Sequence, residues 1–138
     1  MAFSLNLFHT PIVSFESVSL SLRGMRDAAE FRIVMKDGAA EVSEYVGFFL
    51  PGEPLPEPER RVVCPVERVL SLLNGCRVYS WDGFHGKHPK MVKDGLAFTF
   101  RARVNGGKEI SASGSQNFPR RFAEFRDGLR SIVRGDGK

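Results

Sequence analysis

Long apolar segments are absent from this sequence of 138 residues, since no window approaches the roughly 18 consecutive apolar residues that a membrane-spanning helix needs. The first fifteen residues are apolar, but they contain no Lys or Arg, carry Pro11 early and lack a cleavage site of small residues, so they do not resemble a secretory signal. We therefore expect a cytoplasmic protein with no membrane partner. The 42% hydrophobic and 26% charged residues exclude a disordered, collagenous or coiled-coil chain.

Cysteine is scarce: Cys64 and Cys76 are the only two, and no Cys-x-x-Cys spacing occurs. They flank a predicted helix, which would hold them too far apart for a disulfide. We predict two free thiols that form neither a zinc site nor a redox motif.

Motifs for catalysis are missing as well. The sequence has no P-loop, no His-Glu-x-x-His and no Gly-x-Ser-x-Gly element, so we predict no catalytic residue and no cofactor. His85 and His88 are weak candidates for metal ligands, because Lys87 and Lys90 beside them would repel a dication. A small metal- or thiol-dependent enzyme is therefore only our second alternative.

Alternation of apolar and polar residues predicts the strands. The clearest case is residues 15–23, where valine and leucine alternate with Ser17, Ser19 and Ser21 to give one apolar face and one hydroxyl face. Asp37-Gly38 and Asn105-Gly106 are typical of tight hairpin turns. The remaining strands are expected at residues 30–36, 40–49, 77–82, 96–104 and 108–113.

Two helices are predicted from apolar residues at helical spacing, one opening at Pro65 and closing at Gly75, and one over residues 119–134. Residues 50–60 are rich in proline and should form an extended loop. The fold class that follows is α+β, an antiparallel sheet of about six strands with two helices, in a single domain over residues 1–138. The order βββα-βββα suggests half-repeats at about 14–76 and 77–134, and hence the hypothesis of an internal duplication.

Positive charge is concentrated in the second half of the chain. Residues 1–76 carry a net charge of −3 and residues 77–138 a net charge of +7. A polyanion-binding face would show this pattern, and so would an ordinary solvated helix face with arginine stems over the core edge. The candidate basic face consists of Arg101, Arg103, Arg126, Arg130 and Arg134.

A second candidate lies where the last helix begins. Helix N-termini favour anions and disfavour cations, yet two arginines stand in the predicted first turn. A bound phosphate or carboxylate would relieve that conflict, and so would a carboxylate of the protein itself. The candidate anion-binding residues are Ser113, Ser115, Asn117, Arg120 and Arg121.

The single tryptophan allows two interpretations. Trp81 either belongs to the core, which is the commoner outcome for this residue type, or forms an exposed patch with Phe84 and His85 that binds a partner.

The segments Trp81-Asp-Gly-Phe84, Asp94-Gly-x-x-Phe98-x-Phe100 and Ala112-Ser-Gly-Ser115-x-x-Phe118-Pro119 resemble a pattern in uncharacterised bacterial sequences of similar size. The likeness covers about residues 77–133. It implies a recurring small α+β module and transfers no activity and no catalytic residue.

Together these features predict a non-catalytic binding or interaction module, monomeric or homodimeric, whose partner is another protein or an anionic ligand. The first alternative is a nucleic-acid-binding protein that uses the basic second half, although no RNP, KH or recognition-helix signature is present.

Overall fold

The computed structural model describes residues 11–24, 28–47, 57–86, 97–115 and 117–135. Its six longer strands are β1 (Phe15–Arg23), β2 (Ala28–Lys36), β3 (Ala39–Val46), β4 (Arg60–Cys64), β6 (Ala97–Val104) and β7 (Lys108–Ser115). The two-residue strand β5 (His85–Gly86), a 3₁₀ turn η2 (Val78–Trp81) and the helices α1 (Val66–Gly75) and α2 (Phe122–Arg134) complete the fold.

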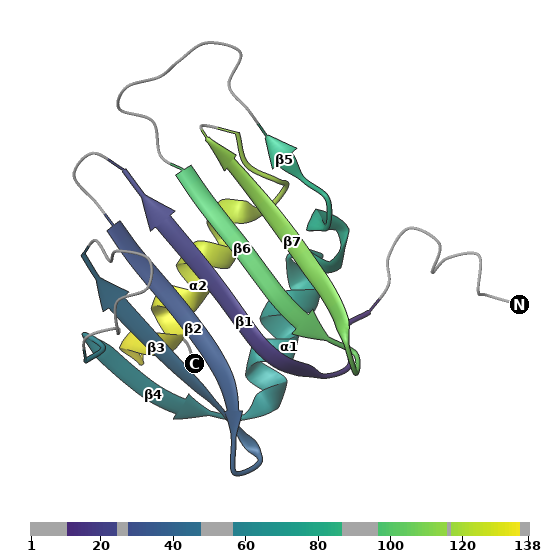
Figure 1. Ribbon diagram of the computed structural model, residues 1–138. Coiled ribbons are helices and arrows are strands. Elements are labelled where there is room, and N and C mark those ends of the chain that lie inside the picture. Colours follow the sequence, from purple (N-terminus) through teal and green to yellow (C-terminus); the bar gives the residue numbers. More distant parts are fainter. Residues whose placement is uncertain (1–10, 25–27, 48–56, 87–96, 116, 136–138) are drawn as a thin grey trace, which may run out of the picture.

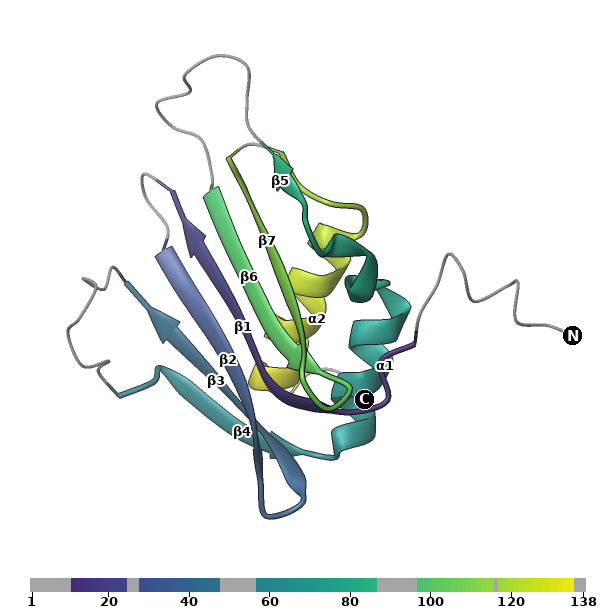
Figure 2. The ribbon, with the colours of Figure 1, turned by 45° about the vertical axis from the view of Figure 1, so that its right-hand side comes forward.

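All strands belong to one sheet in the order β4-β3-β2-β1-β6-β7-β5. The six longer strands pair antiparallel, and β5 pairs parallel with β7. Both helices pack against the same face of the sheet (Figures 1 and 2); no described helix covers the other face, which we call the open face. The predicted α+β class, with about six antiparallel strands and two helices, is confirmed.

The alternating pattern of β1 decides which face of the sheet is buried. Val18, Leu20 and Leu22 are buried under the helices, and the serines between them point to the open face. The two predicted hairpins are present, with Asp37 and Asn105 in the left-handed conformation (φ 54° and 52°) that tight turns between twisted strands require.

An aromatic cluster forms the centre of the core. Trp81 has 1% of its surface exposed, and its ring lies 5.1 Å from that of Phe100 on β6 and 5.3 Å from that of Phe125 on α2, both edge-on. Its indole N–H donates to the carbonyl oxygen of Arg120 at 3.1 Å. Trp81 therefore joins the sheet to the N-terminal end of α2, and the interpretation as a core residue holds.

The prediction of a strand over residues 77–82 is wrong. Arg77 adopts the left-handed conformation (φ 55°) directly after α1, and residues 78–81 form the turn η2. Val78 and Trp81 are both buried because side chains three residues apart lie on the same side of a 3₁₀ turn. On a strand they would have pointed to opposite faces.

Five of the six long strands lie where strands were predicted. The other one, β4, was not predicted. It begins at Arg60, the last residue assigned to the proline-rich loop, of which residues 50–56 lie outside the described residues. The hypothesis of an internal duplication is not confirmed. β1 pairs with β2 and β6 along most of its length, whereas its expected counterpart at residues 77–82 contains the turn η2 in place of a strand.

Two asparagine side chains hold the segment that leads into β1. The amide of Asn74, in the last turn of α1, accepts from the N–H of Ile12 (2.7 Å) and donates to its carbonyl oxygen (2.9 Å). Asn105, in the β6–β7 turn, accepts from the N–H of Val13 and donates to the carbonyl oxygen of Pro11. Ile12 is buried as a result, with 2% of its surface exposed.

Candidate functional site

The open face of the sheet carries a row of arginines and serines that crosses six strands. Ser19 on β1 lies directly opposite Arg101 on β6 and Arg32 on β2, and the register continues to Ser111 on β7, Ser43 on β3 and Arg61 on β4. We call these six positions the central row. They share a face because side chains opposite one another in an antiparallel pair point the same way.

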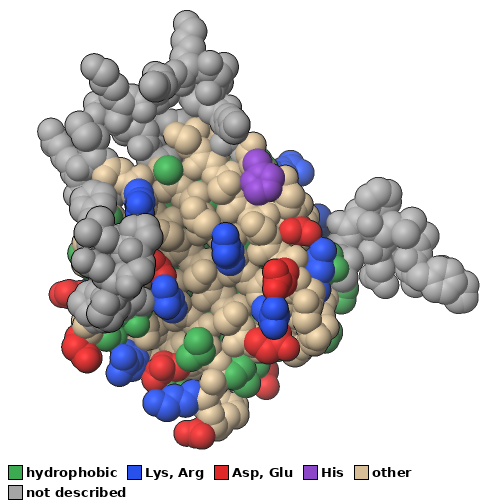
Figure 3. All heavy atoms as spheres, viewed as in Figure 1, with side chains coloured by type: hydrophobic (Ala, Val, Ile, Leu, Met, Phe, Trp, Pro, Cys, Tyr) green, Lys and Arg blue, Asp and Glu red, His purple; other side chains and the backbone are tan. Residues whose placement is uncertain are grey.

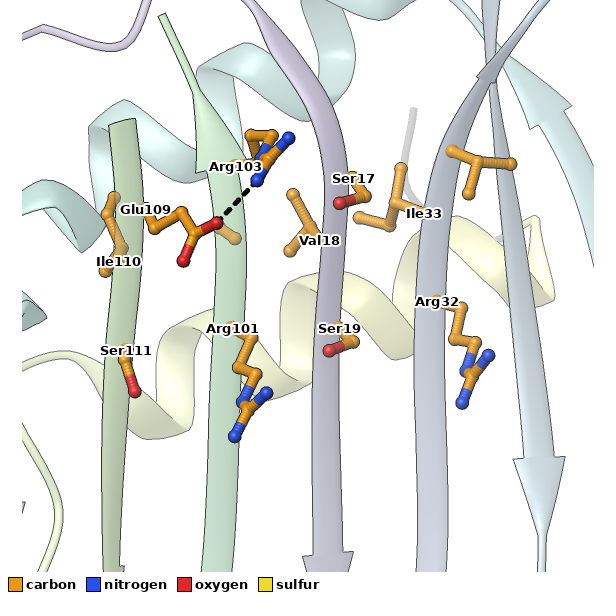
Figure 4. A pocket seen from close by; sticks show the side chains of 12 residues that line it. Ser17, Val18, Ser19, Arg32, Ile33, Arg101, Arg103, Glu109, Ile110 and Ser111 are labelled. Atoms are coloured by element: carbon orange, nitrogen blue, oxygen red, sulfur yellow. Dashed lines mark hydrogen bonds and ion pairs between the residues drawn. The ribbon is translucent and has the colours of Figure 1, made fainter. Parts of the chain in front are cut away.

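Figure 4 shows how the side chains of the central row lie. Arg101 and Arg32 extend from either side of Ser19, and Ser111 lies beyond Arg101. These residues help to line a hollow of about 680 Å³ over β7, β6, β1 and β2. The small side chains of Ser17 and Ser19 on β1 line the hollow between longer arginine side chains on the neighbouring strands β6 and β2. In the space-filling view, backbone and uncharged polar side chains cover the centre of this face, with Lys and Arg side chains spaced across it (Figure 3).

Parallel rows of side chains border the central row on each side. One, which we call the Glu109 row, contains Glu109, Arg103, Ser17, Val34, Glu41 and Val63. The other, which we call the Glu30 row, contains Ser113, Thr99, Ser21, Glu30 and Tyr45. The central row itself contains no carboxylate.

Carboxylates of the bordering rows pair with three arginines of this face. Arg103 donates to Glu109 at 2.6 Å, and its guanidinium lowers the pKa of that carboxyl group below the usual value. Arg32 pairs with Glu30, and the nearest atoms of Arg61 and Glu41 are 3.9 Å apart. Arg101 has no ion pair or hydrogen bond within the described part of the chain, although its charge also helps to lower the pKa of Glu109.

His85 stands at the β7 edge of this face. Its Nδ1 atom lies 3.1 Å from the hydroxyl oxygen of Ser113, its partner in the short β5–β7 pairing. A serine beside a histidine is the minimum arrangement for nucleophilic catalysis. In the described residues, however, no carboxylate contacts His85, and Asp82 is engaged with Lys108 and Ser111. The pair therefore fits the polar rim of a binding surface better than a catalytic triad.

The five residues of the candidate basic face do not share a surface. Arg101 and Arg103 lie on the open face, whereas Arg126, Arg130 and Arg134 belong to α2 in the helix layer behind the sheet (Figure 1). Arg126 pairs with Asp127 at 3.2 Å, and the Nε atom of Arg130 is buried. The sequence-predicted stripe on α2 is thus separated from the arginines of the strands.

The five candidate anion-binding residues at the start of α2 are likewise distributed over both layers. Ser113 and Ser115 are part of β7, and Arg121 is the residue that precedes α2. The guanidinium of Arg121 donates to the carbonyl oxygen of Gly75 at the end of α1 (3.0 Å), and Arg120 contributes its carbonyl oxygen to the Trp81 bond. The negative end of α1 therefore offsets the unfavourable position of Arg121, and no bound anion is needed for that purpose. Asn117 is half-buried.

The aromatic candidates do not form an exposed patch. Trp81 is in the core and Phe84 is half-buried against Phe98, with ring centroids 6.2 Å apart, so only His85 of the three is exposed. His88 lies outside the described residues. Within the described ranges, no group of three or more His, Cys, Asp or Glu residues is placed to hold a metal ion. Cys64 and Cys76 are buried free thiols, as predicted, and burial raises the pKa of each above its ordinary value.

Asp82 fastens the turn η2 to β7. Its carboxylate accepts from the Nζ of Lys108 (2.9 Å) and from the N–H of Ser111 (3.0 Å), and these bonds, the first above all, lower its pKa. We expect Asp82→Ala to lower the free energy of unfolding at pH 7 by about 1 kcal/mol. This is less than the usual contribution of a hydrogen bond to a charged group, because the side chain of Asp82 is about one-third exposed.

The expected pH dependence of this effect has a definite sign. A carboxylate with a lowered folded-state pKa stabilises the fold above its unfolded-state pKa, and that contribution disappears as the pH falls through the folded-state value. The difference between wild type and Asp82→Ala, measured by urea unfolding, should therefore be largest at neutral pH and vanish in acid below about pH 3. Asp82→Asn should retain the bond from Ser111 and lose less. A difference that grows towards acid pH would contradict the assignment.

No helix within the described residues has the length and apolar character needed to cross a membrane. Comparisons with protein-family models, with curated proteins and with solved structures found no match for the chain.

Proposed function

We propose that this protein is a non-catalytic binding module that holds an anionic ligand on the open face of its sheet. One observation carries the proposal: Arg101 extends over a hollow, between the hydroxyl-bearing residues Ser19 and Ser111, and has no partner within the described part of the chain. A guanidinium group beside two hydroxyl donors suits a carboxylate, phosphate or sulfate, because all of these accept several hydrogen bonds at once.

The surrounding charges support the same function. Arg32, Arg61 and Arg103 of this face already pair with carboxylates in the bordering rows, so their positions are partly set before a ligand binds. The six positions of the central row are all arginine or serine, so no carboxylate stands among them, and Ser43 is the one of the six that is buried.

Nucleic acid is the alternative ligand, favoured by the net charge of +7 in the second half of the chain. Three of the arginines in the candidate basic face lie on α2, on the other side of the sheet from Arg101, so a single polyanion on one surface would not reach both groups. The open face is therefore the better supported location for either ligand.

Titration calorimetry with linear inorganic polyphosphate tests the proposal. We expect binding that weakens as NaCl is added, and Arg101→Glu should weaken it at least about tenfold, since it replaces the unpaired cation with an anion. The matched control is Arg134→Glu, which makes the same charge change on the exposed end of α2 and should change the affinity less than about twofold. Equal losses in the two variants, or no binding by the wild type, would refute the proposal.

A further inference from the structure

The arginines of the central row recur on every second strand. Arg101, Arg32 and Arg61 lie on β6, β2 and β4, with serines on β1 and β3 between them. Neighbouring strands are about 4.8 Å apart, so the backbone positions of successive arginines are about 10 Å apart across the strands. A ligand that meets all three must carry anionic groups at a matching spacing.

The cationic strip is narrow. Residues on one face of a strand are about 7 Å apart, so the Glu109 row and the Glu30 row place carboxylates within about 7 Å on each side of the central row. An α-helix is about 10–12 Å wide with its side chains and would press against both rows of carboxylates. A chain in extended conformation is narrower and fits along the central row alone.

The other side chains of the face favour a peptide over a nucleic acid. Val34 and Val63 on the Glu109 row have 42% and 58% of their surfaces exposed beside Arg32 and Arg61, which offers apolar contacts that a peptide uses. Bases of single-stranded nucleic acid need aromatic side chains on which to stack. Among the described positions of this face, Tyr45 is the single Phe, Tyr or Trp residue.

From these observations we infer that the ligand is an acidic segment of a partner protein, bound in polyproline II conformation across the strands, with an acidic side chain at every third residue opposite Arg101, Arg32 and Arg61. This inference rests on the proposed function of the open face. Polyproline II has three residues per turn and a rise of about 3.1 Å per residue, so acidic side chains at every third position lie on one side about 9 Å apart. That repeat matches the arginine spacing, and carboxylates or phosphorylated side chains would serve equally.

The contribution of the three arginines should be graded. Arg101 makes no ion pair within the described residues and has only a weaker electrostatic interaction with Glu109, whereas a ligand must share Arg32 with Glu30 and Arg61 with Glu41. We therefore expect Arg101→Ser to weaken peptide binding at least tenfold and Arg32→Ser and Arg61→Ser to weaken it three- to fivefold each. Thermal unfolding followed by circular dichroism would establish that each variant is folded.

The deciding experiment compares three fluorescein-labelled probes by anisotropy. The first is a peptide of four Glu-Pro-Pro repeats, the second contains the same residues with the four glutamates contiguous, and the third is an oligothymidylate of equal net charge. We expect the repeat peptide to bind at least tenfold more tightly than either of the others. Arg134→Glu should leave its affinity within twofold of wild type.

The other outcomes separate this inference from the proposed function. Equal binding of the two peptides would refute the spacing and overturn the inference, while an effect of Arg101→Ser on both would retain an anion-binding face. Tighter binding of the oligothymidylate would overturn the inference and identify nucleic acid as the ligand. If none of the three probes binds and polyphosphate also fails, both the inference and the proposed function are refuted.

Discussion

Replacing Trp81 with alanine should lower the free energy of unfolding by about 3–5 kcal/mol, which is a large part of the stability of a domain this size. The side chain is almost wholly buried and contacts Phe100, Phe122 and Phe125. Its removal leaves a cavity between the sheet and α2 and also leaves the carbonyl oxygen of Arg120 without its N–H donor. Guanidinium unfolding followed by circular dichroism measures the loss, since the variant has no tryptophan fluorescence.

Trp81→Phe is the matched control. It retains an aromatic ring in the cluster but loses the N–H donor and part of the volume, so we expect a loss of about 1–2 kcal/mol. A loss below about 2 kcal/mol for Trp81→Ala would show that the turn η2 rearranges and that Trp81 does not join the layers. Because the open face lies on the other side of the sheet, folded Trp81→Phe should bind the anionic probes as wild type does.

The strands that sequence patterning predicted are those in which local pattern and tertiary environment agree. β1 alternates cleanly because one face is buried and the other is open, and both hairpins have the turn residues that their backbone angles require. β4 was missed because the five residues of this edge strand, Arg-Arg-Val-Val-Cys, do not alternate. The pattern around Trp81 was misread as a strand because Val78 and Trp81 are buried by a 3₁₀ turn, a conformation set by the packing of Trp81 against α2.

The candidate site was only partly predictable for a related reason. The alternating serines of β1 indicated a hydroxyl face, and Arg101 and Arg103 were expected to point outward. That Arg101 and Arg32 lie on either side of Ser19 depends on strand order and register, and the β1–β6 pairing joins Ser19 to a residue more than 60 positions away in the sequence. Arg61 was hidden in the unrecognised β4. The sequence shows that both β6 and α2 carry arginines, but it does not show that these two groups lie on opposite sides of the sheet.

The role of the arginines before α2 also could not be predicted from the sequence. Two arginines before α2 suggested a missing anion, because the positive end of a helix disfavours cations. Arg121 instead reaches the carbonyl end of α1, where the helix dipole has the favourable sign. The end of α1 and the start of α2 lie side by side because of the way the chain folds. No local sequence motif predicts this contact.

Asn74→Ala should release the segment before β1 and lower the free energy of unfolding by about 2–3 kcal/mol. The amide of Asn74 makes both hydrogen bonds of the Ile12 backbone and a third to the carbonyl oxygen of Leu70, and alanine removes all three and leaves the N–H and carbonyl oxygen of Ile12 without these partners. Ile12 would lose its fixed position in the core as well. Urea unfolding measures the loss, and hydrogen exchange should show faster exchange at the amide of Ile12 than in wild type.

Asn74→Asp distinguishes the hydrogen bonds from simple packing. The introduced carboxylate still accepts from the N–H of Ile12, but its second oxygen faces the carbonyl oxygens of Ile12 and Leu70, which the native amide meets with donors. We expect a loss at pH 7 at least as large as that of Asn74→Ala. The loss should shrink as the pH falls towards 4, because a protonated carboxyl group regains one donor, whereas the loss in Asn74→Ala should show no such recovery. Parallel pH profiles for the two variants would mean that the shape of the side chain, and not its paired donor and acceptor, holds the segment in place.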